Sequence, residues 1–470
     1  MTMMRNAVIL GTALLAAGCT GMPDYKKPDV AVPAAWRSTE PFHESIPNDG
    51  ALKGNWWELF QDAQLNQLAQ QAIDQNQNLC VAVARLEQAR AQISVNAAGL
   101  VPQIGLQAGA ARQKSSADRP LASYGTPSQS TVQDNYQLGF AVNYEADLFG
   151  RVRNTVESAR ASAEQAAADL ENTRLVLLAE LATDYFTLRA LDAEIDVVRQ
   201  ALVLQQKALD LVTARHDLGA ASGLDLAQQQ SLLDANRAQL ELLQSQRAQY
   251  EHALATMTGV PAPGFSLPPA LMKLAPPPLP IGLPSDVLQR RPDIASAERA
   301  IAAANAGIGI ARSAYFPTIT LQANGGWNSN QMSTLLSAPS LLWSLGTALT
   351  HTLFDAGKTD ATVKIAEASY TASVARYRQS VLTAMQEVED GIEGLAALSR
   401  AFSQSEASVH SSQRVFDLAN DRYTGGVATY LEVITAQQSL LANQRQTVQI
   451  QGKQMVTSVY LIKALGGGWR

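Results

Sequence analysis

Histidine and cysteine, which commonly carry out catalysis or bind metals, are sparse in this chain. Five His and two Cys, Cys19 and Cys80, are spread over 470 residues, and none stands at the spacing of zinc ligands. No G-x-S-x-G, phosphate-binding loop or paired-His motif occurs. We therefore expect neither an enzyme nor a bound metal or cofactor, and no disulfide framework. Cys80 lies in an apolar helical run, where we expect a buried small side chain.

Cys19 directly follows a predicted secretory signal, residues 1–18. Arg5 precedes an apolar run from Ala7 to Ala17, which at about 11 residues is too short for a permanent membrane span. The end of the run, Leu15-Ala16-Ala17-Gly18-Cys19, resembles the lipobox of bacterial lipoproteins. The resemblance implies a diacylglycerol on the Cys19 thiol and an acyl chain such as palmitate on the new amino group. Ordinary cleavage beside an unrelated Cys is the alternative.

The residues after Cys19 indicate a destination and a tether. Thr20 follows, whereas Asp at this position is associated with retention in the inner membrane, so the lipobox resemblance implies sorting to the outer membrane. Residues 19–55 are rich in proline and polar side chains and form a predicted lipid-anchored tether. Several buried acyl chains would anchor it firmly, at about 0.8 kcal/mol per CH₂ group.

Charge and composition narrow the classes of protein to which the chain can belong. The chain has 36 Lys and Arg against 42 Asp and Glu, a net charge of −6, and no basic block. Because phosphate binding needs clustered Lys and Arg, this balance argues against nucleic acid as a partner. Hydrophobic residues make up 46% of the chain but aromatic residues only 6%, a composition that leans toward long helices and coiled coils.

The chain contains two copies of one unit. Leu100–Ile104 matches Tyr315–Ile319 at an offset of 215 (Pro102 to Pro317), and Leu148-Phe149 matches Leu353-Phe354 at 205. Arg215–Ala220 matches Arg422–Val427 at 207. We predict repeat 1 at residues 56–258, a Pro-rich linker at 259–284, repeat 2 at 285–466 and a short tail at 467–470.

Each repeat is expected to end in a long helical hairpin, at about 151–258 and 357–465. Apolar residues from Val156 onward recur in steps of three and four, the pattern of a coiled-coil seam. No Pro or Gly interrupts Arg151 to Leu218, so one helix of roughly 100 Å is predicted. Gly219 with Gly223, and Gly425 with Gly426, allow the chain to reverse.

Four strands are expected, at about 102–112, 136–147, 317–327 and 342–354. Apolar and polar residues alternate along each run of about 9–11 residues, which suits a tilted transmembrane strand as well as a soluble sandwich. Export and the Ser-, Gly- and Gln-rich loops at about 113–133 and 328–340 favour the membrane. Four strands cannot close a barrel in lipid. Two chains would give eight strands, whose side chains nearly fill the interior, whereas three give twelve and a lumen.

In this order the motifs resemble the TolC/OprM-type outer-membrane factors, most closely the NodT-like lipoprotein branch serving RND-type pumps. The matching segments are Trp56–Phe60 with Asp62 and Leu65, Leu148–Arg151, Leu283–Asp286, Arg290–Ile294, Ala314–Pro317, Leu353–Gly357 and Leu465–Trp469. The resemblance implies an α+β membrane protein: a homotrimer with a 12-stranded outer-membrane β-barrel that continues into a long coiled-coil α-helical periplasmic barrel. It also implies two partners, a periplasmic adaptor protein and an inner-membrane RND-type pump.

The two helical turns are the predicted functional positions. In the family they form the closed tip and the adaptor contact, which places that contact here on Arg215, Gly219, Ala220, Ala221, Arg422, Gly425, Gly426 and Val427; glycines that merely permit reversal are the alternative. The acidic residues Asp217, Asp225, Asp421 and Glu432 are candidates for threefold gate or selectivity rings. Related proteins often carry Asp where this chain has Ala428, so a gate ring at that position is in doubt.

Arg290–Ile294 has an architectural interpretation, because Pro292 suits the first position of a helix and Asp293 complements its N-terminus. The expected function is a passive exit duct for drugs or other small toxic compounds, at the Gram-negative outer membrane. Type I protein export, metal efflux, and a coiled-coil tether without a lumen are the alternatives.

Overall fold

A computed structural model describes residues 23–29, 36, 54–116, 131–271, 275–277 and 290–467. The predicted signal peptide, Cys19, and most of the tether lie outside the described residues. So do most of the 113–133 loop, part of the 259–284 linker, and residues 468–470 of the tail. The chain divides into two compact units, and each draws on both repeats: Met1–Pro28, Arg85–Ala166 and Ala297–Tyr377 form one, and Asp29–Ala84, Ala167–Ser296 and Arg378–Arg470 form the other.

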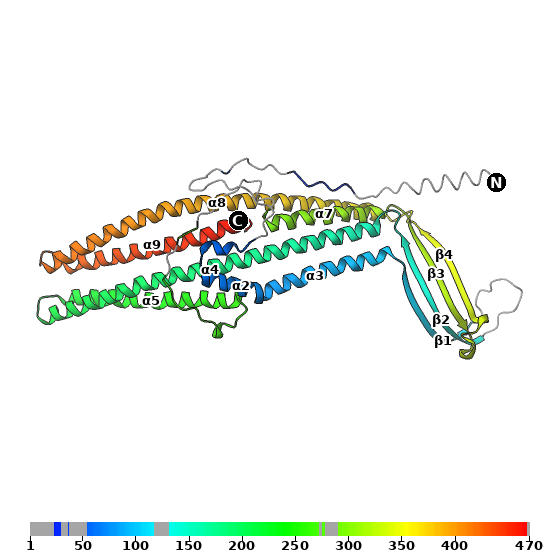
Figure 1. Cartoon of the computed structure of the whole chain (residues 1–470), viewed down its shortest axis with the longest axis horizontal. Coiled ribbons are helices and arrows are strands. Elements are labelled where there is room, and N and C mark those ends of the chain that lie inside the picture. Colours follow the sequence, from blue (N-terminus) through cyan, green and yellow to red (C-terminus); the bar gives the residue numbers. More distant parts are fainter. Residues whose placement is uncertain are drawn as a thin grey trace. The chain divides into compact units, whose positions relative to one another are not determined.

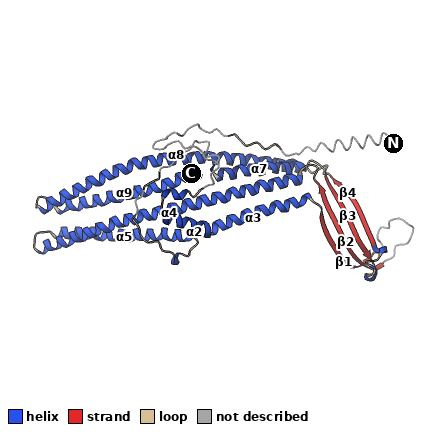
Figure 2. Ribbon diagram, in the orientation of Figure 1, coloured by secondary structure: helices blue, strands red, loops and turns tan. Residues whose placement is uncertain are grey.

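The first unit contains one antiparallel sheet of four strands in the order β1-β2-β3-β4 (Figure 2). The strands are β1 (Gln103–Ser115), β2 (Thr131–Ala146), β3 (Thr318–Ser329) and β4 (Leu341–Thr350). The expectations were 102–112, 136–147, 317–327 and 342–354. The largest differences are the start of β2, which at Thr131 comes five residues before the expected 136, and the end of β4, which stops four residues short of the expected 354 at Thr350, directly opposite the start of β3 at Thr318.

One face of the sheet is apolar and exposed in the single chain. The register aligns Ile104 with Val142, Val142 with Ala323, and Ala323 with Leu345 across all four strands. Large apolar side chains that are more than half exposed on this apolar sheet face are Ile104, Leu106, Val132, Phe140, Leu341, Trp343, Leu345 and Leu349. The opposite face carries small and polar residues, including the bonded pair Asn324 and Ser344. The alternation expected from the sequence is therefore present, with both outer edges, β1 and β4, unpaired.

The long helices have equal lengths in the two repeats. Helices α4 (Arg151–Asp217) and α8 (Lys358–Thr424) have 67 residues each, and α5 (Gly223–Met257) and α9 (Tyr430–Ala464) have 35 each (Figure 1). Helices α8 and α9 each start and end at an offset of 207 from α4 and α5, their counterparts in repeat 1. Gly150 and Gly357, both at positive φ, precede the two long helices at the same offset. The match of Leu148-Phe149 to Leu353-Phe354 at 205 is thus two positions out of step with the structure.

The remaining helices are α2 (Ala63–Gln75), α3 (Gln77–Ala97) and α7 (Pro292–Ser313). Asp62 caps α2 by accepting hydrogen bonds from the backbone N–H groups of Gln64 and Leu65 at 2.8 and 2.9 Å. Helix α7 begins at Pro292 as expected, and the carboxylate of Asp293 accepts from the N–H of Ile294. Within the described residues, no helix is both long enough and apolar enough to cross a membrane.

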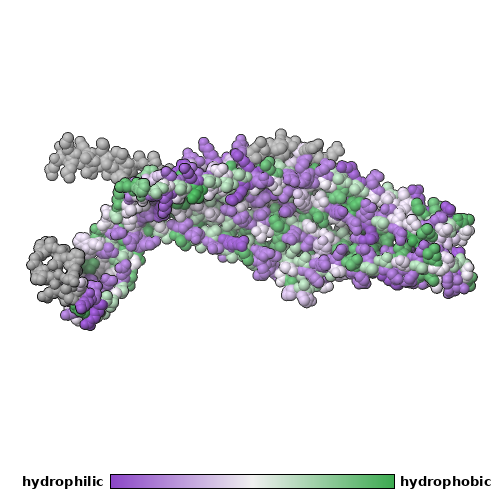
Figure 3. Space-filling model, turned by 180° about the vertical axis from the view of Figure 1, so that it is seen from behind, coloured by the Kyte–Doolittle hydropathy of each residue, from purple (hydrophilic) through white to green (hydrophobic). Residues whose placement is uncertain are grey.

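The predicted seam of α4 is the buried one. Val156, Tyr185, Leu188, Val198 and Val212 are all buried, whereas the outward residues include many polar side chains as well as the exposed Val203, Leu204 and Leu211. Hydrophilic and hydrophobic residues are accordingly interspersed over the helical surface (Figure 3). The sequence interpretation of Cys80 is wrong, because this residue is exposed. Helix α3 buries only a narrow stripe that includes Leu79 and Leu86, and Cys80 lies about 100° around the helix from Leu79.

Candidate functional site

The two helical turns are built by the same backbone motif. In the first turn the N–H of Ala220 donates to the carbonyl of Arg215 (2.7 Å) and the N–H of Gly219 donates to that of His216 (2.8 Å). This pair of bonds is a Schellman motif, which needs a residue at positive φ; Gly219 supplies it with φ 73°. A side chain there would be strained by about 1–2 kcal/mol, so glycine is the favoured residue at this point of the reversal.

The second turn repeats the motif at the same offset of 207. The N–H groups of Val427 and Gly426 donate to the carbonyls of Arg422 (2.9 Å) and Tyr423 (3.0 Å). Gly426 has φ 75°. The helices that follow start differently, because Ser222 forms a capping box with Asp225 whereas Thr429 makes no side-chain cap. The second turn is therefore held by fewer side-chain bonds than the first.

The structure brings the two turns together, as their shared place in the repeats predicts. The guanidinium of Arg215 lies over the ring of Tyr423, 4.7 Å from its centroid. The Tyr423 ring packs against Tyr430 with centroids 4.9 Å apart. The Tyr430 hydroxyl donates to Oε1 of Gln229 on α5 at 2.9 Å, and this contact is buried. One cation–π contact and one hydrogen bond thus join the two helical hairpins beside the turns.

A small hydrophobic cluster supports these contacts. Its members come from all four long helices and are Val212, Leu232, Ala419, Tyr423, Tyr430, Val433, Ile434 and Ala436. Burial raises the pKa of Tyr430 to about 12, with Tyr423 and Asp225 adding smaller effects in the same direction. The Tyr430 hydroxyl is therefore a neutral donor at physiological pH.

The four acidic candidates have different surroundings. Asp225 is committed to the capping box, where its carboxylate accepts from the N–H of Ser222 at 3.1 Å. Glu432 lies 3.9 Å from Arg422 in an exposed ion pair. Asp217, with its side chain 71% exposed, lies 3.5 Å from the ring of His216, and Asp421 is exposed. Asp217 and Asp421 are thus the candidates whose carboxylates are not used to build a turn or to pair with Arg.

An apolar groove lies beside the second turn. It has a volume of about 590 Å³ and is lined by residues of α8 and α9 that include Val415, Leu418 and Leu431, with Arg422 and Glu432 at its polar side. These three apolar side chains are more than half exposed, as is Val427 in the turn. Exposed apolar side chains gathered around a groove mark an interaction surface. The predicted contact residues Arg422 and Val427 lie at or next to this groove.

Sequence reasoning missed Tyr423, Tyr430 and Gln229. At the offset of 207 the two tyrosines correspond to His216 and Gly223 in repeat 1. The aromatic pair therefore belongs to repeat 2 alone. The available signal was two tyrosines within one short stretch beside a turn, in a chain with few aromatic residues.

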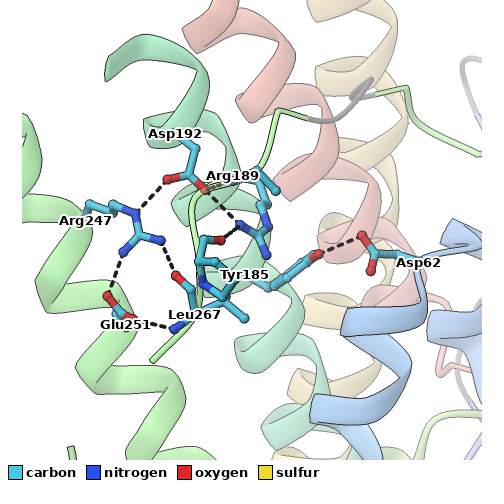
Figure 4. Close-up of polar contacts among 9 residues, drawn as sticks. Asp62, Tyr185, Arg189, Asp192, Arg247, Glu251 and Leu267 are labelled. Atoms are coloured by element: carbon cyan, nitrogen blue, oxygen red, sulfur yellow. Dashed lines mark hydrogen bonds and ion pairs between the residues drawn. The ribbon is translucent and has the colours of Figure 1, made fainter. Parts of the chain in front are cut away.

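A second polar site holds the linker against the first helical hairpin (Figure 4). Asp192 on α4, which is almost fully buried, binds Arg189 at 2.9 Å and Arg247 of α5 at 2.6 Å. Arg247 also pairs with Glu251 at 2.6 Å. Four backbone groups of the linker join this network: the carbonyls of Leu267 and Pro268 accept from Arg247 and Arg189, and the N–H groups of Leu267 and Ala270 donate to Glu251 and Asp192. The corresponding positions of repeat 2 are Ala396, Ser399, Gln454 and Ser458, so only the repeat followed by the linker has this network.

Arg291 makes the architectural contacts expected of the Arg290–Ile294 motif. Its guanidinium, mostly buried, binds Asp293 at 2.7 Å, pairs with Glu387 on α8, and donates to the carbonyl of Ala464 at the end of α9 at 3.0 Å. These contacts tie the start of α7 to both helices of the second hairpin. Within the described part of the chain, no group of His, Cys, Asp or Glu is arranged to hold a metal ion.

Residues 23–28 lie along α7 and α8 in the first unit. Asn305 donates to the carbonyl of Pro23 at 2.8 Å, and Lys27 pairs with Glu298 at 2.8 Å. Burial, and to a smaller degree Glu298, raise the pKa of Tyr25 to about 12. Residues 23–28 of the predicted tether are therefore fixed to the helices.

Comparison with known proteins identifies the family. Residues 68–260 and 283–467 match the family described as outer membrane efflux protein. The pyoverdine export outer membrane protein OpmQ of Pseudomonas aeruginosa is 32% identical over 468 residues, which cover 99% of this chain and 98% of that protein. The toluene efflux pump outer membrane protein TtgF of Pseudomonas putida is also 32% identical. The aligned region covers 98% of this chain and 96% of TtgF.

Two solved structures extend the comparison to the fold. The outer-membrane channel OprN has a TM-score of 0.88 and 30% identity, covering 96% of this chain and 100% of its own. The MtrE outer membrane channel of Neisseria gonorrhoeae, solved in an open state, has a TM-score of 0.81 and 27% identity, covering 96% and 98%. Because the family match spans most of the sequence and these relatives cover nearly all of it, the chain belongs to the outer membrane efflux protein family.

Proposed function

We propose that three copies of this chain form the outer-membrane exit channel of a tripartite efflux system, completed by a periplasmic adaptor and an inner-membrane pump of the RND type. By family the chain is an outer-membrane efflux protein. The relatives OpmQ and TtgF are named as outer membrane proteins of pyoverdine export and of a toluene efflux pump. Small toxic compounds are accordingly the proposed cargo. Transport energy would come from the pump.

The observation that carries the proposal is the open four-stranded sheet with an exposed apolar face. Each unpaired N–H or C=O group facing lipid costs several kcal/mol, so the free edges of β1 and β4 require partner strands. Three chains supply twelve strands, enough to enclose a lumen. The small and polar face, with Asn324 and Ser344, then lines water.

The test is the mass and the conductance of the purified protein. In mild detergent a trimer is expected, and the same preparation should conduct ions in planar bilayers. Neutralising an exposed turn acid by Asp217→Asn should lower cation selectivity if the turns line the narrow end of the channel, with Asp234→Asn, about 17 Å along α5 from its first residue, as a control. A monomer that stays soluble without detergent, or a trimer without conductance, would leave the non-channel tether as the explanation.

Anchoring through a lipid on Cys19 is part of the proposal. The support is the lipobox resemblance, together with the fixed segment that begins at Pro23, shortly after Cys19. Cys19→Ala should abolish incorporation of labelled palmitate while Cys80→Ala leaves it unchanged. Persistent labelling of the Cys19→Ala variant would refute the anchor without affecting the channel.

The turns are proposed to contact the adaptor. The support is the groove at the second turn and the exposed apolar side chains around both turns, including Leu218 and Val427. The residues assigned to this contact remain Arg215, Gly219, Ala220, Ala221, Arg422, Gly425, Gly426 and Val427.

A further inference from the structure

We propose that β4 lengthens through Leu353 when it pairs with β1 of a second copy, in the register that places Leu353 opposite Ile104 of the partner subunit. This inference rests on the trimer proposed above and specifies how its strands meet. It follows from the internal duplication, because the pairing of β2 with β3 within the chain is a template for the pairing of β4 with β1 between chains.

The structural correspondence of the two repeats is fixed by several landmarks. The first strands begin at Gln103 and Thr318, an offset of 215. From the second strand onward the offset is 207, as shown by Gly150 and Gly357, both at positive φ. The offset changes within the β1–β2 connection, which is longer than the β3–β4 connection.

The two hairpins verify these offsets independently. In the first hairpin Leu106 pairs with Phe140. Moving Leu106 by 215 and Phe140 by 207 gives Leu321 and Thr347, which are paired in the second hairpin. The offset of 205 suggested by the Leu-Phe motif would instead pair Leu321 with Leu345, which the structure does not show.

The same offsets convert the β2–β3 register into the register between copies. Within the chain Ala146 pairs with Ile319, and Tyr144 pairs with Leu321. Adding 207 to the number of a β2 residue gives its equivalent on β4, and subtracting 215 from the number of a β3 residue gives its equivalent on β1. The first pair then becomes Leu353 with the partner's Ile104, and the second becomes His351 with the partner's Leu106. The full template then runs from Trp343 to Leu353 on β4.

The inferred register keeps the apolar sheet face continuous. Leu349 lies in line with Ile319, and Ile319 with Ala146, so β4 presents this face at Leu349 and, two and four positions on, at His351 and Leu353. Ile104 lies on the same face of β1. A slip of one position would turn every side chain of the added strand to the other face, so only slips of two positions compete.

Exposure in the single chain agrees with a missing partner at this position. Leu353 is 91% exposed and Ile104 is 72% exposed. Residues 351–353 follow the end of β4, and β3, which begins at Thr318, does not extend far enough to pair with them. The β2 equivalents of these residues, by contrast, are in strand and paired with β3. A second copy of β1 supplies the corresponding partner, and pairing covers both apolar side chains.

Cysteine cross-linking tests the register. Leu353→Cys and Ile104→Cys are combined in a Cys80→Ala background, and outer membranes are oxidised and separated on a non-reducing gel. Directly opposite residues can meet the Cβ separation of about 3.5–4.5 Å that a disulfide needs, so cross-linked dimers and trimers are expected. A second pair, Leu349→Cys with Ala108→Cys, belongs to the same register and should cross-link as well.

Matched controls shift the register by two positions on the same face. They are Leu353→Cys with Leu106→Cys, and His351→Cys with Ile104→Cys. Diagonal neighbours lie about 7–8 Å apart, so roughly tenfold lower yields are expected. Higher yields from a control pair, or no cross-links in an intact trimer, would overturn the register while leaving the channel in place. No cross-link from any pair in a protein that is also monomeric would overturn the proposed function itself.

Discussion

At the scale of single residues, the buried charges of this chain serve to hold backbone rather than to do chemistry. The carboxylate of Asp192, which is almost fully buried, binds two arginines and accepts a hydrogen bond from one N–H group of the linker. A buried ion pair contributes little when complete, but removing one partner leaves an unpaired charge in a low dielectric. The network therefore makes the linker's path sensitive to one side chain.

We expect Asp192→Asn to destabilise the first hairpin and release the linker. The change leaves Arg189 and Arg247 without their shared carboxylate, a loss of about 3–5 kcal/mol. Urea unfolding and the rate of thermolysin cleavage near Leu267 measure it. The matched control is Asp234→Asn, whose partner Arg237 is exposed and whose pair is worth less than about 1 kcal/mol. Equal effects from the two variants would contradict the role of the network.

Asp184 on α4 should make stability depend on pH. Burial, reinforced by Glu180, raises its pKa from 3.8 to about 6. Between these two values the folded state therefore retains a proton that the unfolded state releases. The ionised Asp184 lowers the free energy of unfolding: this loss is absent below pH 3.8, grows between 3.8 and 6, and is complete above pH 6. Asp184→Asn should stabilise the protein by roughly 1–2 kcal/mol at pH 7.5, less than the roughly 3 kcal/mol that the full pKa shift corresponds to, because the carboxylate is only partly buried and solvent screens it; at pH 4 the gain should be small. Unfolding curves at both pH values check this, and an equal gain at both would exclude the pKa as the cause.

At the scale of elements, helix packing depends on glycine where two helices approach closely. A Cβ atom on Gly452 of α9 would lie 2.6 Å from the Cβ atom of Ala190 on α4, whereas one on Gly307 of α7 would meet nothing within 4 Å. Both glycines lie inside helices. Their substitution separates the effect of packing from that of helix propensity.

Gly452→Ala should lower stability and Gly307→Ala should raise it. Alanine gains about 1 kcal/mol of helix propensity at either position. At Gly452 the overlap with Ala190 forces α4 and α9 apart, and overpacking of this kind costs about 1–3 kcal/mol. Thermal unfolding followed by circular dichroism should give Tm changes of opposite sign. Stabilisation by both substitutions would show that α4 and α9 do not pack this closely.

A bulky side chain in the second turn should block the adaptor without unfolding the turn. A Cβ atom at Gly426 meets nothing within 4 Å, so Gly426→Trp projects away from the helices. Gly426→Ala is the control, because it carries the same positive-φ strain of about 1–2 kcal/mol without the bulk. Gly426→Trp is expected to weaken adaptor binding at least about tenfold, or 1.4 kcal/mol, in a pull-down. Unchanged binding and unchanged drug susceptibility of the cells would count against the contact.

At the scale of the whole molecule, the sequence was informative wherever a local pattern decides the structure. The uninterrupted stretch from Arg151, the turn glycines and the alternation along the strands each depend on residues close together in the chain, and the duplication is visible as a recurrence of such local motifs. Contacts that depend on how two helices are rotated against each other did not follow. Cys80 was assigned to the interior because its helix is apolar, and the approach of Arg215 to Tyr423 joins residues from different repeats, far apart in the chain.

The contacts between the two hairpins should restrain opening of the proposed channel. In a trimer the turns of both hairpins surround one axis, so the Tyr430–Gln229 bond and the Arg215–Tyr423 contact oppose their separation. Tyr430→Phe keeps the packed ring but leaves Oε1 of Gln229 without its donor, at a cost of about 1–3 kcal/mol. The population of separated turns then rises about tenfold for each 1.4 kcal/mol.

Single-channel recording in planar bilayers measures this effect, with more frequent or longer open events expected for Tyr430→Phe and a larger increase when it is combined with Arg215→Ala. Tyr250→Phe makes the same chemical change on α5, roughly 40 Å along the helix from the first turn, and should leave the recordings unchanged. The trimer must be intact in all variants, which native electrophoresis verifies. If Tyr430→Phe and Tyr250→Phe conduct alike, the hairpins are not held together by this bond, and the closed state depends on other contacts, such as the pairing of Arg445 on α9 with Glu194 on α4.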